Sequence, residues 1–181
     1  MDNGVSSYRR LLDGDLDAFE EIMTTYRQGL TFFIDSFVRD SMVAEDIAID
    51  VFTYILLHPR AYNGKTQLKT YLYMLGRSRA IDHLRHKKRY ATLSLTDTAD
   101  IADREELEDR VLQSEENRRL YAAIADLPEA MRTAVYLVYF EGLSYSEAAA
   151  VMKKSKKQVD NLIYRAKGIL KDALKEGEPL K

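Results

Sequence analysis

The chain has 181 residues, with 27 Lys and Arg against 29 Asp and Glu and neither Cys nor Trp, so disulfide scaffolds, cysteine-ligated zinc sites and thiol chemistry are excluded. Its longest apolar runs, at residues 52–57 and 134–140, are far shorter than the ~20 residues of a membrane helix, and residues 1–10 lack the apolar stretch of a secretory signal. We therefore expect a cytoplasmic protein that does not insert into a membrane.

The first half of the chain predicts a bundle of long helices, because its apolar residues recur every three or four positions. Such a stripe runs over residues 19–37, and a second helix is expected at about 42–57. His58-Pro59 should end that helix, and Tyr62-Asn63-Gly64 predicts a turn. A third helix is expected at about residues 66–88.

A linker is indicated at residues 91–103, which are small, polar and acidic and carry no helical apolar stripe. We therefore place one domain at residues 5–90, a linker at 91–114 and a second domain at 115–175. The charge is also segregated: the net charge is −7 over residues 1–57, +8 over 58–90, −7 over 91–117 and +4 over 118–181. Such blocks are informative about partners, and the basic ones favour nucleic acid.

Two capped helices joined by a short turn predict a helix-turn-helix in the second domain. Ser144 is followed three residues later by Glu147, and Ser155 by Gln158, and each pair has the pattern of a capping box. Helices are therefore expected at residues 145–152 and from Ser155 onward, after a helix at residues 129–141 that Gly142 ends.

The last helix has an apolar face and a basic, amide-rich face. Such a helix can enter the DNA major groove and contact base edges, although a solvated basic face on a helical hairpin is the alternative interpretation. The apolar face consists of Val159, Leu162, Ile163, Ala166, Leu170 and Ala173.

The end of the third helix combines basic residues with tyrosines. Arg77 and the basic residues that follow it lie among Tyr71, Tyr73 and Tyr90. Aromatic rings among cations suit unpaired nucleic acid, whose bases stack on them. The alternative is that these tyrosines pack in the core while the charges are solvated.

The ordered motifs of both domains resemble the sigma-70 family of bacterial RNA polymerase sigma factors. Ala44-Glu45-Asp46-Ile47 and Asp50-Val51-Phe52 resemble its second conserved region, Tyr71-Leu72-Tyr73 and residues 75–85 its promoter-melting helix, and motifs within 127–167 its fourth region. The short length resembles the extracytoplasmic-function (group IV) type. The implied fold is all-α: two small helical domains, a region 2 bundle and a region 4 helix-turn-helix, joined by an acidic linker.

The resemblance implies a transcription initiation factor, not an enzyme, that binds core RNA polymerase and directs it to promoters through −10 and −35 elements. It implies no cofactor and no metal, and it leaves open whether an anti-sigma factor is a further partner. The acidic helix would bind the basic clamp-helix surface of the polymerase through Glu45, Asp46, Ile47, Asp50 and Phe52.

The resemblance also assigns the DNA contacts. The −10 element would be read by the loop at residues 62–68 and the helix behind it, with a flipped base in a pocket that the loop helps form. The residues concerned are Tyr62, Asn63, Lys65, Lys69, Tyr73, Arg77 and Arg79. The −35 element would be contacted by Lys156, Lys157, Gln158, Asn161, Tyr164 and Arg165.

Several positions depart from the family pattern. Ile49 stands where glutamine is usual, and Asp160 and Leu162 occupy recognition-helix positions that are frequently basic. We interpret these departures as drift within the family and as an indication of an unusual promoter sequence.

Two other classes of protein remain as alternatives. A helix-turn-helix repressor or activator that acts without core polymerase would use its N-terminal domain only to dimerise, which the acidic helix at residues 44–52 argues against. A metal-dependent enzyme would need His83, His86 and Asp82 to converge, which residues on one helical turn rarely do.

Overall fold

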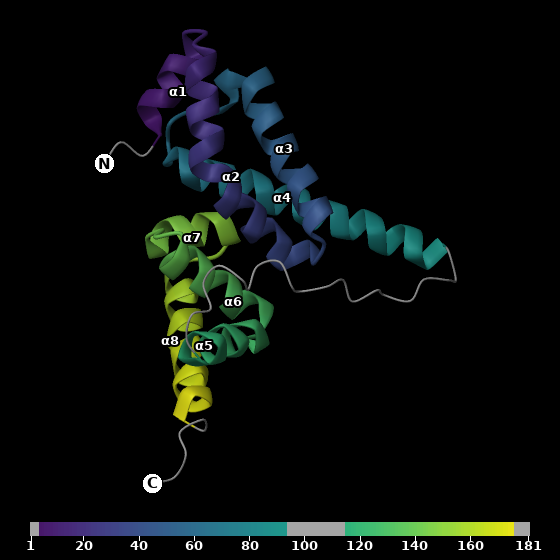
Figure 1. Ribbon diagram of the computed structural model, residues 1–181, viewed down its shortest axis with the longest axis vertical. Helices are drawn as coiled ribbons and strands as arrows, with labels where there is room; N and C mark the ends of the chain where they lie inside the picture. The colour runs from purple at the N-terminus through teal and green to yellow at the C-terminus, as the bar shows by residue number, and fades with distance from the viewer. Residues whose placement is uncertain (1–3, 94–114, 176–181) are drawn as a thin grey trace. The chain divides into compact units, whose positions relative to one another are not determined.

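The computed structural model describes residues 4–93 and 115–175, and every element in these residues is helical (Figure 1). The chain divides into two compact units, the first holding α1–α4 and the second α5–α8. Residues Ala150–Lys153 are described with the second unit, because they complete α7 and the turn after it. The expected all-α fold is confirmed. The linker from residue 94 onward lies outside the described residues, and the exact domain limits stay a prediction.

The first unit is built around one long central helix. Helix α2 (Leu16–Val38) packs against α1 (Val5–Leu12), α3 (Ser41–Leu57) and α4 (Leu68–Leu93), and a short 3-10 helix η1 (Pro59–Ala61) follows α3 (Figure 1). The three long helices agree with the sequence analysis within a few residues at most ends, whereas α1 was not predicted. The largest fully buried side chains include Tyr8, Ile22, Leu30, Phe33, Ile34, Phe52, Ile55, Leu68, Leu72 and Tyr73.

Local side-chain bonds set the ends of these helices. The Asp15 carboxylate accepts a hydrogen bond from the backbone N–H of Asp17 at 3.0 Å and so starts α2. Asp40 starts α3 in the same way, accepting from the N–H of Val43 at 3.1 Å. Between them Arg39 adopts a left-handed conformation, with φ 53°, that ends α2. Two residues therefore suffice to link α2 to α3.

A glycine allows α4 to lie close against α2. Gly76 is buried, and a Cβ atom there would lie 2.9 Å from Cδ1 of Leu30 and 3.2 Å from Cδ1 of Ile34. Ordinary carbon contacts lie at 3.5–4.0 Å, so any larger residue would force the two helices apart. The glycine thereby fixes the position of the helix that carries the predicted −10 contacts.

The second unit contains α5 (Glu115–Asp126), α6 (Glu129–Val135), a π-helical segment η2 (Tyr136–Phe140), α7 (Tyr145–Met152) and α8 (Lys156–Lys175). Helix α8 packs against α5 and α6. The helix expected at residues 129–141 is present, but its last turns are π-helical. As expected, Gly142 ends it, with φ 67°.

No helix within residues 4–93 and 115–175 is long and apolar enough to cross a membrane.

Candidate nucleic-acid interface

Both predicted capping boxes are formed in the second unit. At the start of α8, the backbone N–H of Ser155 donates to Oε1 of Gln158 at 2.8 Å, and the N–H of Gln158 donates to Oγ of Ser155 at 3.2 Å. At the start of α7, the N–H of Ser144 donates to Glu147 at 2.8 Å, and the return bond is 3.3 Å. The sequence prediction of the helix-turn-helix is confirmed at this level of detail.

The turn between α7 and α8 is held by the backbone itself. The N–H of Lys154 donates to the carbonyl of Ala149 at 2.9 Å, and the N–H of Lys153 donates to that of Ala150 at 3.3 Å. These are the two bonds of a Schellman motif, and Lys153 takes the left-handed position at φ 52°. The angle between the two helices is thus fixed by short-range bonds.

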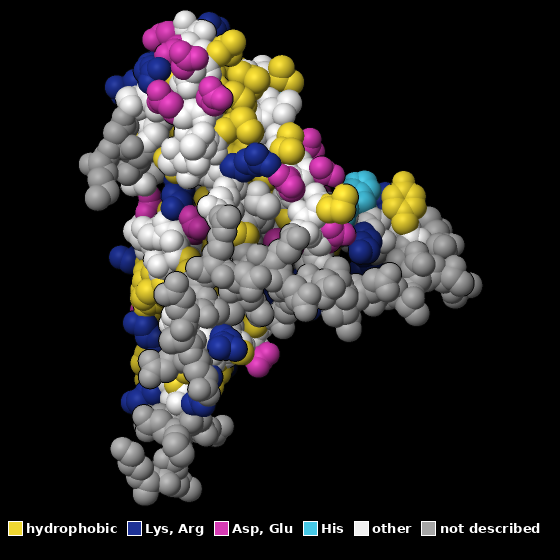
Figure 2. Space-filling view, viewed as in Figure 1, with side chains coloured by type: hydrophobic (Ala, Val, Ile, Leu, Met, Phe, Trp, Pro, Cys, Tyr) yellow, Lys and Arg dark blue, Asp and Glu magenta, His cyan; other side chains and the backbone are white. Residues whose placement is uncertain are grey.

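Helix α8 separates its faces largely as the sequence predicts, although Leu162 and Leu170 are only half-buried and Ala173 is exposed. Val159, Ile163 and Ala166 are buried, and the six predicted −35 residues are all exposed, with Tyr164 80% exposed. Figure 2 shows Lys and Arg side chains along the edge where Figure 1 draws α8. The structure therefore brings these six residues together at the surface of one helix: Lys156, Lys157, Gln158, Asn161, Tyr164 and Arg165.

Helix α3 combines exposed acidic side chains with buried apolar ones. Glu45, Asp46 and Asp50 are exposed, but Ile47 and Phe52 are only 7% and 1% exposed. Direct contact with a partner, as the sequence analysis expected of all five, is therefore not available to Ile47 and Phe52. They pack in the core and hold the helix that carries the acids.

Two apolar residues lie on the exposed side of α3; the sequence analysis named Ile49 only as a departure from the family pattern and did not single out Met42. Met42 is 79% exposed and Ile49 42% exposed, and Leu57 at the end of the helix is 68% exposed. Met42 and Ile49 lie seven residues apart, which places them on the same face two turns apart. The signal was available, since these apolar positions alternate with the acids and fall out of phase with the buried stripe. We call Met42, Glu45, Asp46, Ile49 and Asp50 the α3 surface.

One residue of the α3 surface is paired within the chain. Nη2 of Arg27, on α2, forms an ion pair with Oε1 of Glu45, and each side chain is about half exposed. Part of the negative charge of this surface is therefore neutralised by the protein itself.

The loop between α3 and α4 is compact. Oδ1 of Asn63 accepts from the backbone N–H of Lys65 at 3.0 Å, Gly64 has φ 71°, and the Tyr62 hydroxyl donates to the carbonyl of Thr66. The turn expected at residues 62–64 is confirmed, and the side chains of Asn63 and Lys65 are exposed on it.

Two of the predicted −10 residues lie inside the protein. Tyr73 is 0% exposed, with its ring centroid 5.0 Å from that of Phe33, and Tyr62 is 9% exposed. For Tyr73, the alternative interpretation of a tyrosine packed in the core describes its position in the structure. The remaining three predicted residues of α4 are partly exposed: Lys69, Arg77 and Arg79.

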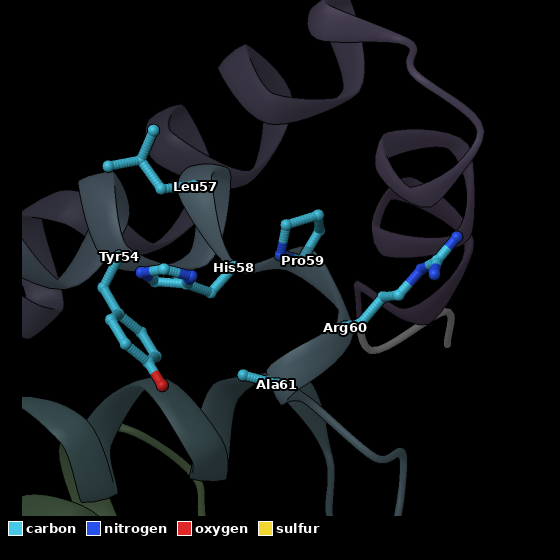
Figure 3. Close-up of a pocket in the computed structure, with 6 residues that line it drawn as sticks. All are labelled: Tyr54, Leu57, His58, Pro59, Arg60 and Ala61. Carbon is cyan, nitrogen blue, oxygen red and sulfur yellow. The ribbon is translucent and has the colours of Figure 1, made fainter.

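An open pocket of about 520 Å³ adjoins this loop, lined by Tyr54, Leu57, His58, Pro59, Arg60 and Ala61 (Figure 3). The rings of Tyr54 and His58 lie side by side, 4.9 Å apart, whereas Arg60 points away from them. The guanidinium of Arg79 lies 5.1 Å from the Tyr54 ring, and its Nη1 is buried without a hydrogen-bond partner in the described part of the chain. Aromatic faces and an unused donor are thus close together.

The histidines near the end of α4 do not gather with acids. Asp82 pairs with Arg85 at 3.2 Å, and residues 4–93 and 115–175 contain no group of three or more His, Asp or Glu that could hold a metal ion.

Comparison with known proteins gives the family. Residues 22–90 match the family described as Sigma-70 region 2, and residues 117–170 match Sigma-70, region 4. The chain is similar to the RNA polymerase sigma-H factor of Pseudomonas aeruginosa, with 30% identity over 174 residues that cover 91% of this chain and 90% of that protein. It is also similar to the ECF RNA polymerase sigma factor SigX of Bacillus subtilis, with 28% identity over 160 residues that cover 86% and 82%.

Two solved structures share the fold. The sigma factor RpoE of Bartonella quintana, in complex with the anti-sigma factor NepR, has a TM-score of 0.68 at 20% identity and covers 88% of this chain and 98% of its own. CnrH, in complex with the cytosolic domain of CnrY, has a TM-score of 0.67 at 21% identity and covers 98% and 100%. The chain belongs to the sigma-70 family of RNA polymerase sigma factors, among those of the ECF type.

Proposed function

We propose that this sigma factor uses three separate surfaces in promoter-directed initiation. The α3 surface binds core RNA polymerase, the loop at residues 62–68 and the start of α4 engage the −10 element, and α8 reads the −35 element. The observation that carries this proposal is the formed helix-turn-helix, whose two capping boxes present the six −35 residues on one exposed helix face. The chain acts as an initiation factor in the cytoplasm, not as an enzyme.

The α3 surface has the chemistry of a protein interface. Its exposed apolar side chains, Met42 and Ile49, supply area to bury, and three carboxylates beside them steer a basic partner. The basic clamp-helix surface of the polymerase, implied by the family resemblance, is such a partner. Asp50→Asn should therefore weaken core binding, mainly at low salt, whereas Glu20→Gln, an exposed acid on α2, serves as the matched control.

The −10 element is proposed to be engaged as an unpaired strand. The pocket at Tyr54 and His58 offers aromatic faces on which a base can stack, and the buried Nη1 of Arg79 offers a hydrogen-bond donor to its edge. Asn63 and Lys65, exposed on the loop, would contact the same strand, with Lys69 and Arg77 along α4.

The −35 element is proposed to be read in the major groove by α8. Lys157, Gln158, Asn161 and Arg165 carry side chains that recognise base edges, and Lys156 and Tyr164 would contact the backbone. Asp160, exposed among them, would repel phosphate and so limit the backbone contacts on its side of the helix.

A protein that controls this factor is also proposed. Among the structures with the same fold, the sigma factor RpoE is in complex with the anti-sigma factor NepR, and CnrH is in complex with the cytosolic domain of CnrY. We propose that a comparable protein binds this chain.

The test is run-off transcription by purified bacterial core polymerase, with and without the chain, over a pooled promoter library. Transcripts that depend on the chain and share a pair of −10 and −35 sequences are expected. Binding to duplex DNA with no core association and no transcript would instead favour the repressor, and would overturn the proposal.

A further inference from the structure

Helix α1 lies outside the part of the chain that matches the region 2 family, which begins at residue 22. It is nevertheless held firmly in the first unit. Nη1 of Arg10 pairs with Glu21 at 2.8 Å and Nη2 with Asp15 at 2.7 Å, so the end of α1 is tied to the start of α2. On its other face Tyr8 and Leu11 are 2% and 5% exposed. The helix is therefore a fixed element from which a side chain can support a neighbour.

Tyr8 connects α1 to η1, the 3-10 helix that precedes the −10 loop. Its hydroxyl donates to the carbonyl of Pro59 at 2.6 Å, a bond between residues 51 positions apart. Burial raises the pKa of Tyr8 to about 12, and a backbone hydrogen bond from Tyr62 opposes the rise. The phenol is a neutral donor at physiological pH, and its bond to the carbonyl of Pro59 holds the first residue of η1.

The ring of Tyr8 also supports the first residue of the loop. The ring of Tyr62 packs edge-on against Tyr8, with centroids 4.9 Å apart and an interplanar angle of 80°. On its other side, the centroid of the Tyr71 ring on α4 lies 5.1 Å away. Tyr62 in turn closes the loop by donating to the carbonyl of Thr66. Two residues that do not reach the surface therefore hold a loop whose exposed residues are Asn63 and Lys65.

We propose that Tyr8 is a positioning residue for −10 recognition, which holds η1 and Tyr62 so that the loop is already in its strand-binding geometry before DNA arrives. The inference rests on the proposed role of the loop. A loop held in its bound conformation loses less conformational entropy on binding, so affinity and base selectivity both improve. Tyr8 does not itself touch DNA, since it is buried.

The test compares holoenzymes assembled from core polymerase and the full chain carrying Tyr8→Phe, which keeps the ring and its packing but removes the bond to Pro59. The probes are a single-stranded oligonucleotide with the −10 sequence that the wild type selects, and a promoter library randomised at −10 and −35. The stability control is Val38→Ala, a buried residue at the opposite end of α2 from α1.

For Tyr8→Phe we expect about three- to tenfold weaker capture of the single strand, the worth of one hydrogen bond. Base preference at −10 should flatten, while preference at −35 and affinity for core stay unchanged. Val38→Ala should lower the melting temperature and leave both preferences intact. A promoter whose −10 region is already unpaired should restore transcription by Tyr8→Phe only in part, because the variant impairs the loop and not the opening of the duplex.

Two results would overturn the inference, and only the second would also overturn the proposed function. If the wild-type holoenzyme captures the strand and Tyr8→Phe captures it equally, or if Val38→Ala flattens the −10 preference to the same degree, Tyr8 has no positioning role and the proposed function stands. If the wild-type holoenzyme captures no strand and starts no transcript, the proposed function fails and the role of Tyr8 fails with it.

Discussion

In the second unit, the bonds that start α7 and α8 join residues three positions apart, Ser144 to Glu147 and Ser155 to Gln158. In the first unit, the bonds that place the candidate sites join distant parts of the chain. Tyr8 reaches Pro59 across 51 positions, and Arg27 reaches Glu45 across 18. One of the two proposed DNA-reading elements is therefore built locally, on a helix, and the other is a loop held by remote side chains.

This difference has a consequence for function. A helix whose start is fixed by its own cap depends less on distant residues, so changes on the exposed face of α8 should act on DNA binding one contact at a time. A loop supported from α1, α3 and α4 depends on the distant residues of the first unit that contact it. Variants on α8 should therefore impair single DNA contacts, whereas variants in the first unit should also affect residues far from the substitution.

The largest effect is expected from Phe33→Ala. Phe33 is fully buried on α2, where its ring lies 5.0 Å from that of Tyr73 and 5.2 Å from that of Phe37. Removing it should lower the free energy of unfolding of the first unit by about 3–5 kcal/mol. Hydrogen exchange read separately on α2 and α8 measures this. Equal loss of protection in α8 would contradict the separation of the two units.

The same contrast explains what could be predicted from the sequence. Capping boxes, the turn lysines and Gly142 act on backbone a few residues away, and the helix-turn-helix followed from them directly. The long helices of the first unit followed from apolar periodicity. Helix α1, with eight residues and too short a stripe to stand out, was missed.

At the candidate sites, the structure differs from the expectation in the burial of four side chains. Ile47, Phe52, Tyr62 and Tyr73 were expected to contact partners, but each is at most 9% exposed. Family motifs do not distinguish a residue that touches a partner from one that supports it, because both are specific to the fold. A tyrosine suits a core as well as a nucleic-acid surface, and only tertiary contacts decide between the two.

The second prediction concerns base reading by α8. Arg165→Ala should cost about 1–3 kcal/mol of discrimination at one −35 position, as expected for a guanidinium that reads a base edge. The measurement is the position-resolved preference of the holoenzyme over a randomised −35 library.

Lys156→Ala is the matched comparison, at an exposed lysine of the same helix that is proposed to contact the DNA backbone. It should weaken all sequences about equally and reduce the salt slope of binding by about one. If Arg165→Ala behaves in the same uniform way, Arg165 contacts phosphate and the base-reading role belongs to other residues of the helix.

A third, smaller effect is expected from the cap of α8. Ser155→Ala removes the oxygen that accepts from the N–H of Gln158 at 3.2 Å, and it should cost about 1 kcal/mol of stability in the second unit. Because Gln158 is also a predicted −35 contact, the free energy of promoter binding should fall somewhat more than the free energy of unfolding. Chemical denaturation together with binding to −35 duplex DNA measures both.

Ser155→Asp is the control for this variant, since a carboxylate also caps a helix and should preserve stability. Its negative charge beside the DNA should nonetheless weaken binding. Stability lost with Ser155→Asp as with Ser155→Ala would mean that the capping bond is not what the serine contributes.

The smallest expected effect concerns the α3 surface, the proposed binding site for core polymerase. It tests whether the ion pair between Arg27 and Glu45 weakens binding at that surface. Arg27→Gln removes the ion pair with Glu45, and because both side chains are about half exposed, stability should change by less than about 1 kcal/mol. The freed carboxylate should strengthen binding to core polymerase a few-fold at low salt, and the gain should shrink as salt screens it. Titration of labelled chain with core at several salt concentrations measures this, with Arg9→Gln, an exposed arginine on α1, as control. Weaker binding by Arg27→Gln alone would mean that Arg27 contacts the polymerase, so that the pair with Glu45 orders the surface instead of masking it.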